Sequence, residues 1–511
     1  MKKRVFLLKD MVHEPQVSTD VHLPTYRREE VKAGVVHIGI GGFHRAHQAY
    51  FIDRLLEQGI ATEWGICGVA LLESDRKIYD VLSEQHGLYT LMIPNTDGSF
   101  SARVIGSIVE LFYAPENPFA VIRKMADKSI RLITLTITEG GYNFTSEGSF
   151  NWDNDAVLWD LQCPNQPKTV FGYLYAALKL RRDQSVGGLT IQSCDNMEHN
   201  GDVMRRMLYA FIAKADPEMI SWLDRYVAFP NSMVDRITPV TTEALKMTLK
   251  EEFNLLDGWP VVSEPFYQWI IQDSYAAGRP EWERLGGQLV FDVTPYEKMK
   301  IRLLNGGHTL VGLMGYLSGY QYIHESVSDS AIADLLRRYM DEEVTPTLDD
   351  VPGIDLHEYK NTLIERFKNP FIKDEVTRII SGSSAKFPKF ILPVILDRIR
   401  ENQSVNIAAL ITACWYRYLS LNLTTSQHVQ DEMATALVQS VARAEQEQNP
   451  LLFLDAVEIF GDIKEYSVFT ESFLSHISAL SSNGLKSLIA KLNDKENDQL
   501  NNYLPYKTKL L

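Results

Sequence analysis

The sequence predicts two domains of different class: an α/β domain with a doubly wound parallel sheet over residues 1–293, and a mainly α-helical domain over residues 294–511. Three observations predict this division. Short β-branched runs alternate with helical patterns up to about residue 293, which is typical of a parallel sheet covered by helices. A glycine-rich turn follows the first of these runs. Beyond residue 294 the strand-like runs disappear and long helical patterns replace them.

The individual elements follow from local patterns. Runs of Val, Ile, Leu and Thr that are apolar on both faces indicate buried strands, and they occupy residues 35–40, 64–71, 89–93, 103–112, 131–138 and 188–193. Apolar residues three and four apart indicate helices, and in the first domain they occupy residues 44–56, 75–82, 120–126 and 171–180. The same spacing continues in the second domain over residues 296–317, 331–340, 356–367, 371–380 and 406–418.

Composition excludes several classes of protein. A hydrophobic content of 45% and a charged content of 23% are those of a globular chain. The formal charge of −15 argues against a nucleic-acid partner, which requires clustered Lys and Arg. Lys9 and Asp10 interrupt the first apolar run before it reaches signal-peptide length, and no stretch approaches the ~20 apolar residues of a membrane span. We therefore expect a cytoplasmic protein without a membrane partner.

The cysteines do not predict a metal site or a disulfide framework. Cys67, Cys163, Cys194 and Cys414 are widely separated, and no C-x-x-C pair occurs. The neighbouring histidines at positions 44 and 47 have no H-E-x-x-H pattern and no nearby thiolate. We expect any alcohol chemistry in this chain to work without a metal.

A glycine turn follows the first predicted strand. Gly39, Gly41, Gly42 and Phe43 stand between that strand and the helix after it, as in the phosphate-binding turn of a Rossmann-type dinucleotide domain. His44 replaces the third glycine of the G-x-G-x-x-G fingerprint, so the match is incomplete. The position between strand and helix favours a dinucleotide site over a plain glycine turn.

Acidic and amide side chains follow later strands of the same predicted sheet. Asp75 comes after the second strand, where a carboxylate can bind ribose hydroxyls and repel a 2′-phosphate, which favours NAD over NADP. Capping of the following helix is the alternative role for Asp75. Glu139 and Asn196 also follow strands, at the carboxyl edge where ligands of such sheets bind. A turn cap is the alternative for Asn196.

The second predicted domain begins with a polar pattern, Lys300-x4-Asn305-Gly-x-His308. At about 100° per residue, Asn305 lies about 140° and His308 about 80° around the helix from Lys300. An amine, an amide and an imidazole on one side of a helix can remove a proton from an alcohol and stabilise the resulting charge. The alternative is a solvated amphipathic helix.

Together with Val234-Asp235-Arg236-Ile237-x-Pro239 and Glu264-Pro265-Phe266, this pattern resembles the polyol-specific long-chain dehydrogenase family. The resemblance runs from about residue 25 to beyond residue 460. It implies a metal-independent, NAD-dependent enzyme that interconverts a sugar alcohol and its ketose, with D-mannitol and D-fructose as the expected pair. It also implies a monomer.

The resemblance assigns roles to single residues. It implies that Lys300 is the general base, that Asn305 and Asn196 bind the developing oxyanion, and that His308 places the substrate. It further implies that Asp235, Arg378 and Lys386 contact substrate and that Glu297 relays the proton toward solvent. Gly307, where the mannitol enzymes place Ser, and the permuted small residues of 381–389 depart from the family pattern. Both flank substrate contacts, so the polyol itself stays open.

The proposed base places a demand on its surroundings. A lysine at its ordinary pKa of about 10.4 is protonated at neutral pH and cannot accept a proton. Burial beside a nicotinium ring lowers the pKa of an amine by desolvation and by like-charge repulsion. We therefore expect Lys300 to be buried.

Three alternatives remain at this point. A uronate reductase acting on fructuronate or tagaturonate needs a cation for the carboxylate, which Arg378, Lys386 or Lys389 can supply. An arabinitol dehydrogenase shares the same scaffold. A protein of another class, a non-catalytic NAD(H) sensor, needs no base, and the set of Lys, two Asn and His argues against it.

Overall fold

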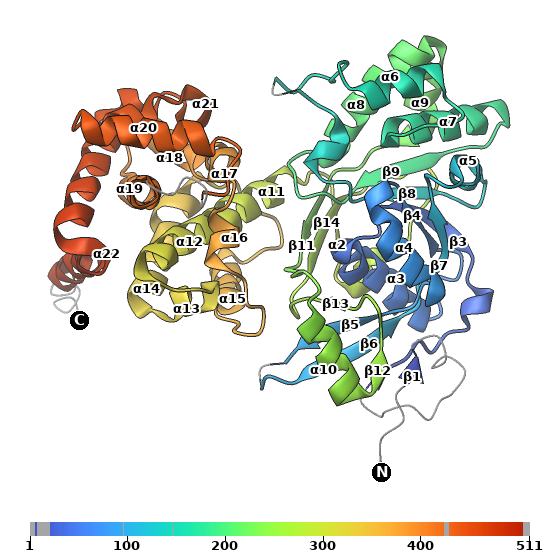
Figure 1. Cartoon of the computed structure of the whole chain (residues 1–511), viewed down its shortest axis with the longest axis horizontal. Helices are drawn as coiled ribbons and strands as arrows, with labels where there is room; N and C mark the ends of the chain where they lie inside the picture. The colour runs from blue at the N-terminus through green and yellow to red at the C-terminus, as the bar shows by residue number, and fades with distance from the viewer. Residues whose placement is uncertain (1–5, 8–20, 96, 146, 424–428, 504–511) are drawn as a thin grey trace, which may run out of the picture. The chain divides into compact units, whose positions relative to one another are not determined.

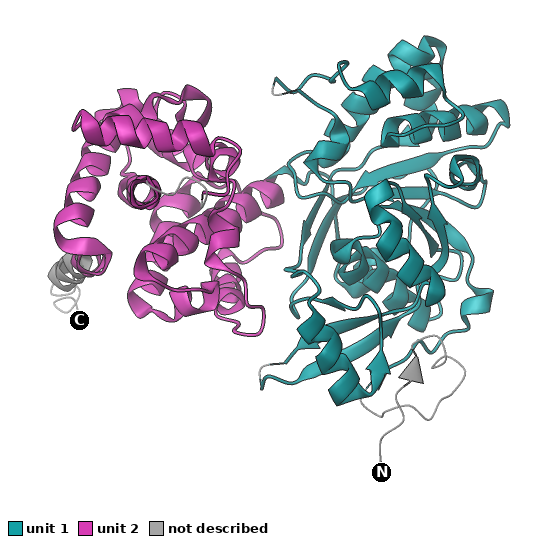
Figure 2. Ribbon diagram, viewed as in Figure 1, with its two compact units in different colours: residues 1–294 teal, residues 295–511 magenta. Residues whose placement is uncertain are grey.

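The computed structural model describes residues 6–7, 21–95, 97–145, 147–423 and 429–503. The chain divides into two compact units, residues 1–294 and 295–511 (Figure 2). The first unit holds all the strands that are described, and the described part of the second unit consists of helices and their connections. This confirms the predicted fold class, an α/β domain followed by a mainly α-helical one.

A six-stranded sheet forms the centre of the first unit. In spatial order its strands are β10 (Val227–Ala228), β9 (Leu189–Ser193), β8 (Leu132–Leu135), β3 (Ala33–Ile38), β4 (Gly65–Ala70) and β7 (Ile108–Tyr113). Every neighbouring pair is parallel. From β3 the chain builds outward through β4 to β7, and then returns to β8 on the other side of β3. The order of the strands therefore reverses between β3 and β8, and ligands of such sheets bind at the carboxyl ends of the strands at this reversal.

Helices cover both faces of this sheet, and each face has its own hydrophobic core (Figure 1). Helices α5 (Pro118–Ala126), α7 (Val170–Asp183) and α8 (Asn200–Ala215) pack on one face, and α2 (Gly42–Ala46), α3 (Gln48–Glu57) and α4 (Arg76–Glu84) pack on the other. Along β3, Val36 and Ile38 join the first core whereas Val35 joins the second. Alternate side chains of a strand point to opposite faces, so β3 contributes apolar side chains to both cores.

Three smaller sheets complete the first unit. They consist of β13 (Val261–Val262), β5 (Tyr89–Pro94), β6 (Phe100–Ile105) and β2 (Val21–His22); of β11 (Ser232–Asp235), β14 (Gln268–Gln272) and β15 (Gln288–Val290); and of β1 (Phe6–Leu7) with β12 (Leu255–Leu256). The remaining helices of this unit are α6 (Asp155–Gln162), α9 (Ile220–Tyr226) and α10 (Glu243–Phe253).

The structure corrects the prediction of one strand over residues 103–112. This segment contains the end of β6 and most of β7, which belong to different sheets. The chain turns between them because the Gly106 amide donates a hydrogen bond to the Asp53 carboxylate, at 2.9 Å, and the Ser107 hydroxyl donates to the Ala49 carbonyl, at 2.7 Å. Only Gly106 and Ser107 separate the apolar runs of the two strands.

Two predicted helices are also corrected. The helix over residues 44–56 is two helices, α2 and α3, because the backbone at His47 leaves the helical region (φ −123°, ψ −88°). The helix over residues 371–380 is only α16 (Val376–Ile380). Residues before it run beside the chain near Tyr322, which bridges to Glu375, and their backbone bonds are used there instead.

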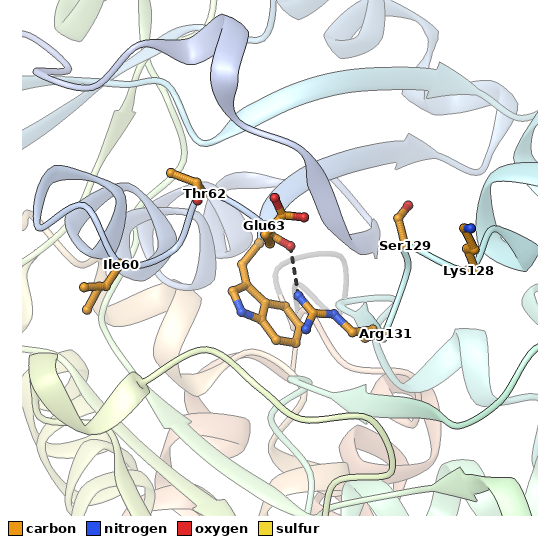
Figure 3. A pocket seen from close by; sticks show the side chains of 7 residues that line it. Ile60, Thr62, Glu63, Lys128, Ser129 and Arg131 are labelled. Atoms are coloured by element: carbon orange, nitrogen blue, oxygen red, sulfur yellow. Dashed lines mark hydrogen bonds between the residues drawn. The ribbon is translucent and has the colours of Figure 1, made fainter.

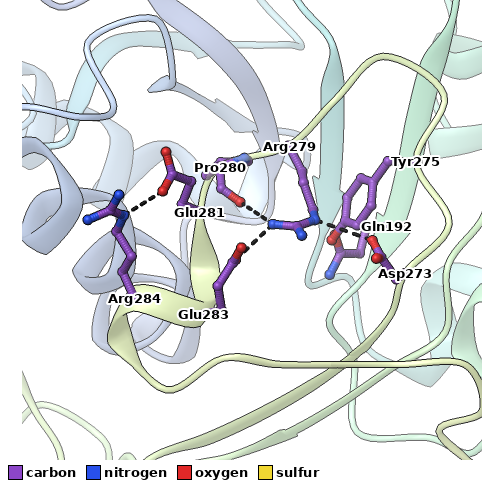
Figure 4. A network of polar contacts seen from close by, with 8 residues as sticks. All are labelled: Gln192, Asp273, Tyr275, Arg279, Pro280, Glu281, Glu283 and Arg284. Atoms are coloured by element: carbon purple, nitrogen blue, oxygen red, sulfur yellow. Dashed lines mark hydrogen bonds and ion pairs between the residues drawn. The ribbon is translucent and has the colours of Figure 1, made fainter.

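A loop between β14 and β15 is tied to the central sheet by polar contacts (Figure 4). Arg279 donates to the Asp273 and Glu283 carboxylates and to the Pro280 carbonyl. The Tyr275 hydroxyl donates to the Gln192 side chain of β9, at 3.1 Å. These contacts hold the loop against the strand whose end carries Asn196.

The second unit is built around two buried helices, α12 (Gly306–Ser318) and α19 (Asn406–Leu421). Glu343 caps α19, because its carboxylate accepts the backbone N–H groups of Ile407, at 2.7 Å, and Ala408, at 2.8 Å. The other helices are α11 (Thr294–Lys300), α13 (Ile323–Ser328), α14 (Ser330–Arg338), α15 (Leu356–Phe367), α16, α17 (Ser383–Phe390), α18 (Leu392–Arg400), α20 (Ala434–Gln446), α21 (Val457–Phe460) and α22 (Ser467–Tyr503), with a break in α22 at Gly484.

The buried Arg181 of α7 yields a prediction about stability. Its guanidinium donates to the carbonyls of Asp127, Ile130, Gly187 and Gly188, which lie in the turns that precede β8 and β9. Arg181→Lys loses the planar fork and leaves buried carbonyls without a donor, so we expect the free energy of unfolding to fall by about 2–4 kcal/mol in urea denaturation.

The neighbouring Arg182 offers the matched control. It lies at the surface and pairs with Asp216 at 3.0 Å, so Arg182→Lys should change the free energy of unfolding by less than about 0.5 kcal/mol. Equal effects of the two substitutions would contradict the assignment of Arg181 as the clamp of these turns.

Candidate cofactor and catalytic site

The first unit contains a cavity of about 880 Å³ at the carboxyl ends of β3, β4 and β8. It lies where the strand order reverses, and its volume is in the range of small-molecule and cofactor sites. Its wall is formed by the glycine turn after β3, by the segments after β4 and β8, and by three more distant segments, which contribute Asn143, Asn154, Ala156, Lys168, Thr169, Val170 and Trp259.

The glycine turn has the geometry that a phosphate-binding turn requires. Gly39 has φ +100°, and a Cβ there would lie 2.1 Å from the Thr136 carbonyl oxygen, so only glycine fits. A Cβ on Gly41 would meet nothing within 4 Å, which leaves open space beside the backbone. Gly42 begins α2. The predicted residues Gly39, Gly41 and Gly42 all line the cavity.

His44, in place of the third glycine, turns into the interior. Its ring stacks on His37 of β3, with centroids 3.3 Å apart and planes 8° from parallel. Burial lowers the pKa of His37 to about 3 and that of His44 well below its usual range, with the neighbouring His37 as a further cause. Both rings are therefore neutral at pH 7. A third glycine normally lets the helix approach the strand, and here two stacked, uncharged rings lie between the helix and the strand instead.

Asp75 also lines the cavity. Its Oδ2 accepts the Leu72 N–H at 3.0 Å, so it closes the turn after β4 as well. The alternative role, capping of the following helix, is not found, because the Asp75 side chain makes no cap hydrogen bond to α4. Lys77 lines the cavity nearby, with its amine 5.4 Å from the Trp259 ring centroid.

Two of the expected cofactor residues do not line the cavity. The Phe43 ring packs against His47, with centroids 5.0 Å apart. Glu139 is exposed, whereas its neighbours Thr138, Gly140 and Gly141 line the wall. Sequence reasoning missed Lys168, Thr169 and Trp259, because they come from distant segments that carry no recognisable motif.

The Lys300, Asn305 and His308 pattern lies on one continuous helical segment of the second unit, but this segment is not a uniform α-helix. Residues Ile301–Asn305 form a π-helical turn, in which the Gly306 N–H donates to the Ile301 carbonyl, five residues back. A π-turn inserts one residue, so later positions are rotated back by about 100°. Measured around the helix axis, Asn305 then lies about 40° from Lys300 in one direction, and His308 lies about 20° from Lys300 in the other. The three side chains share a narrower sector than ideal α-geometry predicts.

The side chains of this segment are closely packed. Lys300 is 6% exposed, in agreement with the expected burial. The His308 ring stacks on Phe367, with centroids 4.0 Å apart. A Cβ on Gly307 would lie 3.1 Å from the Leu336 side chain, so Leu336 occupies space that a serine at this position would need. Glu297, one helical turn before Lys300, is also buried.

Arg378 and Lys386 belong to α16 and α17 of the second unit. Arg378 forms a two-pronged ion pair with Asp374, at 2.7 and 2.6 Å. Lys386 donates to the Ile379 carbonyl at 2.8 Å, and burial followed by the charge of Arg378 lowers its pKa. The charge of Arg378 is thus already balanced, which weakens the case for a cation reserved for a uronate.

Asn196 and Asp235 belong to the first unit. Asn196 follows β9 directly after the buried Asp195, and Asp235 is the buried last residue of β11. Arg236 donates to the Glu264 carbonyl at 3.1 Å, and the Glu264 carboxylate accepts the Ile237 N–H at 2.6 Å. Hydrogen bonds therefore join the Val-Asp-Arg-Ile-x-Pro motif to the Glu-Pro-Phe motif. These bonds hold the end of β11 at Asp235.

A second cavity of about 310 Å³ opens beside the amino ends of β4 and β8, at the opposite edge of the sheet (Figure 3). The Arg131 guanidinium lies 3.7 Å from the Trp64 ring centroid and donates to the Glu63 carbonyl at 3.2 Å. These contacts join the two turns that precede β4 and β8. The position at the amino edge is not the one that dinucleotides occupy in such sheets.

Within the described ranges, no helix is long and apolar enough to cross a bilayer. Among the same residues, no three His, Cys, Asp or Glu side chains are grouped so that they can hold a metal ion.

A Rossmann-type sheet with a cavity at its strand reversal, followed by a helical unit that carries a buried lysine beside an amide and an imidazole, defines a nicotinamide-dependent dehydrogenase with two domains. The particular family follows from comparison with known proteins. The chain belongs to the mannitol dehydrogenase family: residues 33–284 match the mannitol dehydrogenase Rossmann domain, and residues 292–481 match the mannitol dehydrogenase C-terminal domain.

Relatives cover most of the chain. It is 42% identical to a mannitol 2-dehydrogenase of Phaeosphaeria nodorum over 92% of this chain and 83% of that one. It is 44% identical to a mannitol 2-dehydrogenase of Aspergillus fumigatus over 78% of this chain and 81% of that one. Among solved structures, Pseudomonas fluorescens mannitol 2-dehydrogenase, in a ternary complex with NAD and D-mannitol, matches with a TM-score of 0.82 and 41% identity, covering 94% of this chain and 98% of that one. A substrate-free D-sorbitol dehydrogenase matches with a TM-score of 0.84 and 32% identity, covering 93% and 98%.

The different surroundings of Gly39 and Gly41 yield a prediction. Gly41 has φ −67° and open space around it, so alanine can adopt its conformation. We expect Gly41→Ala to leave the melting temperature unchanged but to raise the Kd for NADH about tenfold or more, because the methyl group occupies the approach of the diphosphate. Fluorescence titration with NADH measures this.

Gly39→Ala serves as the contrasting variant. Its Cβ would collide with the Thr136 carbonyl at a positive φ, so it should lower the melting temperature as well as NADH affinity. Unaltered NADH binding by a folded Gly41→Ala protein would show that the cofactor does not approach this turn.

Proposed function

We propose that this protein is an NAD-dependent polyol dehydrogenase that interconverts D-mannitol and D-fructose by general-base catalysis. One observation carries the proposal: 41% identity over 94% of this chain to a mannitol 2-dehydrogenase described in complex with NAD and D-mannitol. A supporting observation is that Lys300, Asn305 and His308, which we propose to be catalytic, lie on one continuous helical segment.

The first unit holds the cofactor in this proposal. The backbone of Gly39, Gly41 and Gly42 would hold the diphosphate at the N-terminus of α2, and Asp75 would accept hydrogen bonds from the adenosine ribose. The cavity fits such a ligand in size, and Gly41 leaves room for its close approach. NAD⁺ supplies a hydride acceptor when it is bound.

The second unit supplies the base. An alcohol releases hydride readily only after it has lost its proton, so Lys300 takes the hydroxyl proton and Glu297 passes it toward solvent. Asn305 and Asn196 donate to the oxygen on which negative charge develops. His308, Asp235, Arg378 and Lys386 contact the remaining hydroxyl groups of the substrate and fix which carbon reacts. No step in this scheme uses a metal ion.

A second candidate substrate is D-sorbitol, because this chain also matches a D-sorbitol dehydrogenase, with 32% identity over 93% of this chain. The higher identity to the mannitol enzyme favours mannitol. The ion pair between Arg378 and Asp374 disfavours a uronate substrate, because Asp374 already neutralises the positive charge with which Arg378 would bind the carboxylate of a uronate. We also propose that the enzyme is a monomer, as the family resemblance implies, and that it works in the cytoplasm, as the short N-terminal apolar run suggests. Light scattering tests the oligomeric state.

The test is NADH oxidation with fructose, xylulose, fructuronate and tagaturonate, with a chelator present throughout. Turnover with fructose that survives the chelator is the expected result. Preference for a uronate would keep the mechanism and change the substrate, and saturable NADH binding without turnover of any ketose would favour a sensor.

Fructose reduction alone does not separate the two hexitols, because reduction at C2 yields mannitol or sorbitol according to the face attacked. Chromatography of the product decides between them. We expect mannitol, and sorbitol as the main product would overturn the substrate assignment.

Substitution of Lys300 tests the base. We expect Lys300→Met to lower kcat by at least about 1000-fold in both directions while NADH still binds, because the buried amine that accepts the proton is removed. Lys298, two residues earlier on α11, is the matched control: it pairs with Asp349 at 3.0 Å, and Lys298→Met should retain kcat within about threefold. Near-normal turnover by the Lys300 variant would show that another group is the base.

A further inference from the structure

The turn after β8 has a strained backbone at the wall of the cofactor cavity. Thr138 has φ +58° and ψ 171°, a combination that is essentially restricted to glycine. Thr138 nevertheless carries a Cβ, and it lines the cavity together with Ile137, Gly140 and Gly141. A residue remains in such a conformation only where its surroundings hold it there.

One carboxylate holds both ends of this turn. Asp195 Oδ1 accepts the Thr138 N–H at 2.8 Å, and Oδ2 accepts the Ile137 N–H at 3.1 Å. The Tyr142 hydroxyl, at the far end of the turn Glu139–Tyr142, donates to the same Oδ2 at 2.7 Å. Ser193 contacts the Tyr142 hydroxyl on its other side. Two adjacent amides and a phenol converge on a side chain that is 8% exposed.

Asp195 is itself anchored. Its carbonyl accepts the Asn200 side-chain amide at 2.9 Å, and Asn200 also exchanges hydrogen bonds with the backbone of Ser232 on β11. The next residue after Asp195 is Asn196, to which the proposed reaction assigns an oxyanion contact. The ends of β8, β9 and β11 are thus joined through one short network.

We propose that Asp195 is a positioning residue, whose carboxylate holds Thr138 in its strained conformation and thereby shapes the cofactor-facing wall beside Asn196. This inference deepens the proposed function and rests on it for the identity of the cofactor. Asp195 does not line the cavity, so it acts through the backbone of the turn. The network supports a role in catalysis beyond stability because the strained residue faces the cavity instead of the core.

The first variant is Asp195→Asn. The amide retains one acceptor oxygen, and its N–H₂ group replaces the other oxygen, so it faces either the Thr138 N–H or the Ile137 N–H and Tyr142 hydroxyl donors. At least one backbone N–H therefore loses its acceptor, and the turn is free to relax. We expect the Kd for NADH to rise about tenfold and kcat for fructose reduction to fall about 100-fold, as for a displacement of reacting groups by about 1 Å.

Asp53 provides a matched control elsewhere in the same unit. It too is a buried aspartate that accepts a backbone N–H, from Gly106 at 2.9 Å, and a tyrosine hydroxyl, from Tyr26 at 2.6 Å. Neither it nor these partners line the cavity. Asp53→Asn should lower the melting temperature without changing NADH affinity or kcat by more than about threefold.

A second substitution at Thr138 separates a positioning role of Asp195 from a contribution to stability alone. Glycine adopts the Thr138 conformation without strain. Addition of Thr138→Gly to the Asp195→Asn variant should therefore raise kcat at least about tenfold above that of Asp195→Asn alone and restore most of the NADH affinity. Thr138→Ala in the same background keeps the Cβ and should restore neither. If Asp195→Asn does not fold, Tyr142→Phe, which removes one of the three donors, should show the same changes to a smaller extent and the same rescue by glycine.

Two results would overturn the inference: equal losses of kcat and NADH affinity in the Asp195 and Asp53 variants, or failure of Thr138→Gly to restore more than Thr138→Ala does. NADH titration needs no polyol, so it tests Asp195 even if the substrate assignment is wrong. Absence of ketose reduction by the wild-type protein would count against the proposed function instead.

Discussion

The carbonyl of Gly39 is the point on which the site in the first unit depends. It accepts hydrogen bonds from His37 Nε2, at 2.9 Å, and from the Thr136 hydroxyl, at 2.8 Å, while the Gly39 N–H donates to Val69 of β4. The carbonyl is an acceptor only, so His37 carries its proton on Nε2 and its Nδ1 accepts from Thr134. Three neighbouring strands thereby fix the turn before α2 begins. The cavity wall, the start of α2 and the His37–His44 stack all follow from this arrangement.

Buried carboxylates perform a related task in both units. Asp195 joins two turns by accepting adjacent backbone amides, and Glu343 closes the start of α19 in the same way. Such acceptors satisfy N–H groups that neither a strand nor a helix can pair, and an unpaired buried amide costs about 1–3 kcal/mol. Elements that end in the interior therefore need these side chains, whereas elements that end at the surface can use water.

The sequence contained enough information for the order of strands and helices, the division near residue 294 and the glycine turn, because these depend on local periodicity and on backbone conformations that need glycine. It did not separate β6 from β7, since the apolar pattern resumes only two residues after β6 ends. Trp259 and Lys168 reach the cofactor cavity from distant segments, and no local pattern marks them. The family motifs identified Lys300, Asn305 and His308, but their angular arrangement depended on a π-turn that uniform helical spacing does not predict.

That π-turn allows the second unit to carry one additional residue without a change of phase. Deleting one residue from Ile301–Asn305 would restore regular α-helix, and His308 would keep its angle to Lys300, because the turn already absorbs one residue. A one-residue change elsewhere in the segment, with regular α-geometry, would instead rotate the imidazole by about 100° relative to Lys300. Changes in chain length within the family should therefore be confined to this turn and to the loops outside the segment.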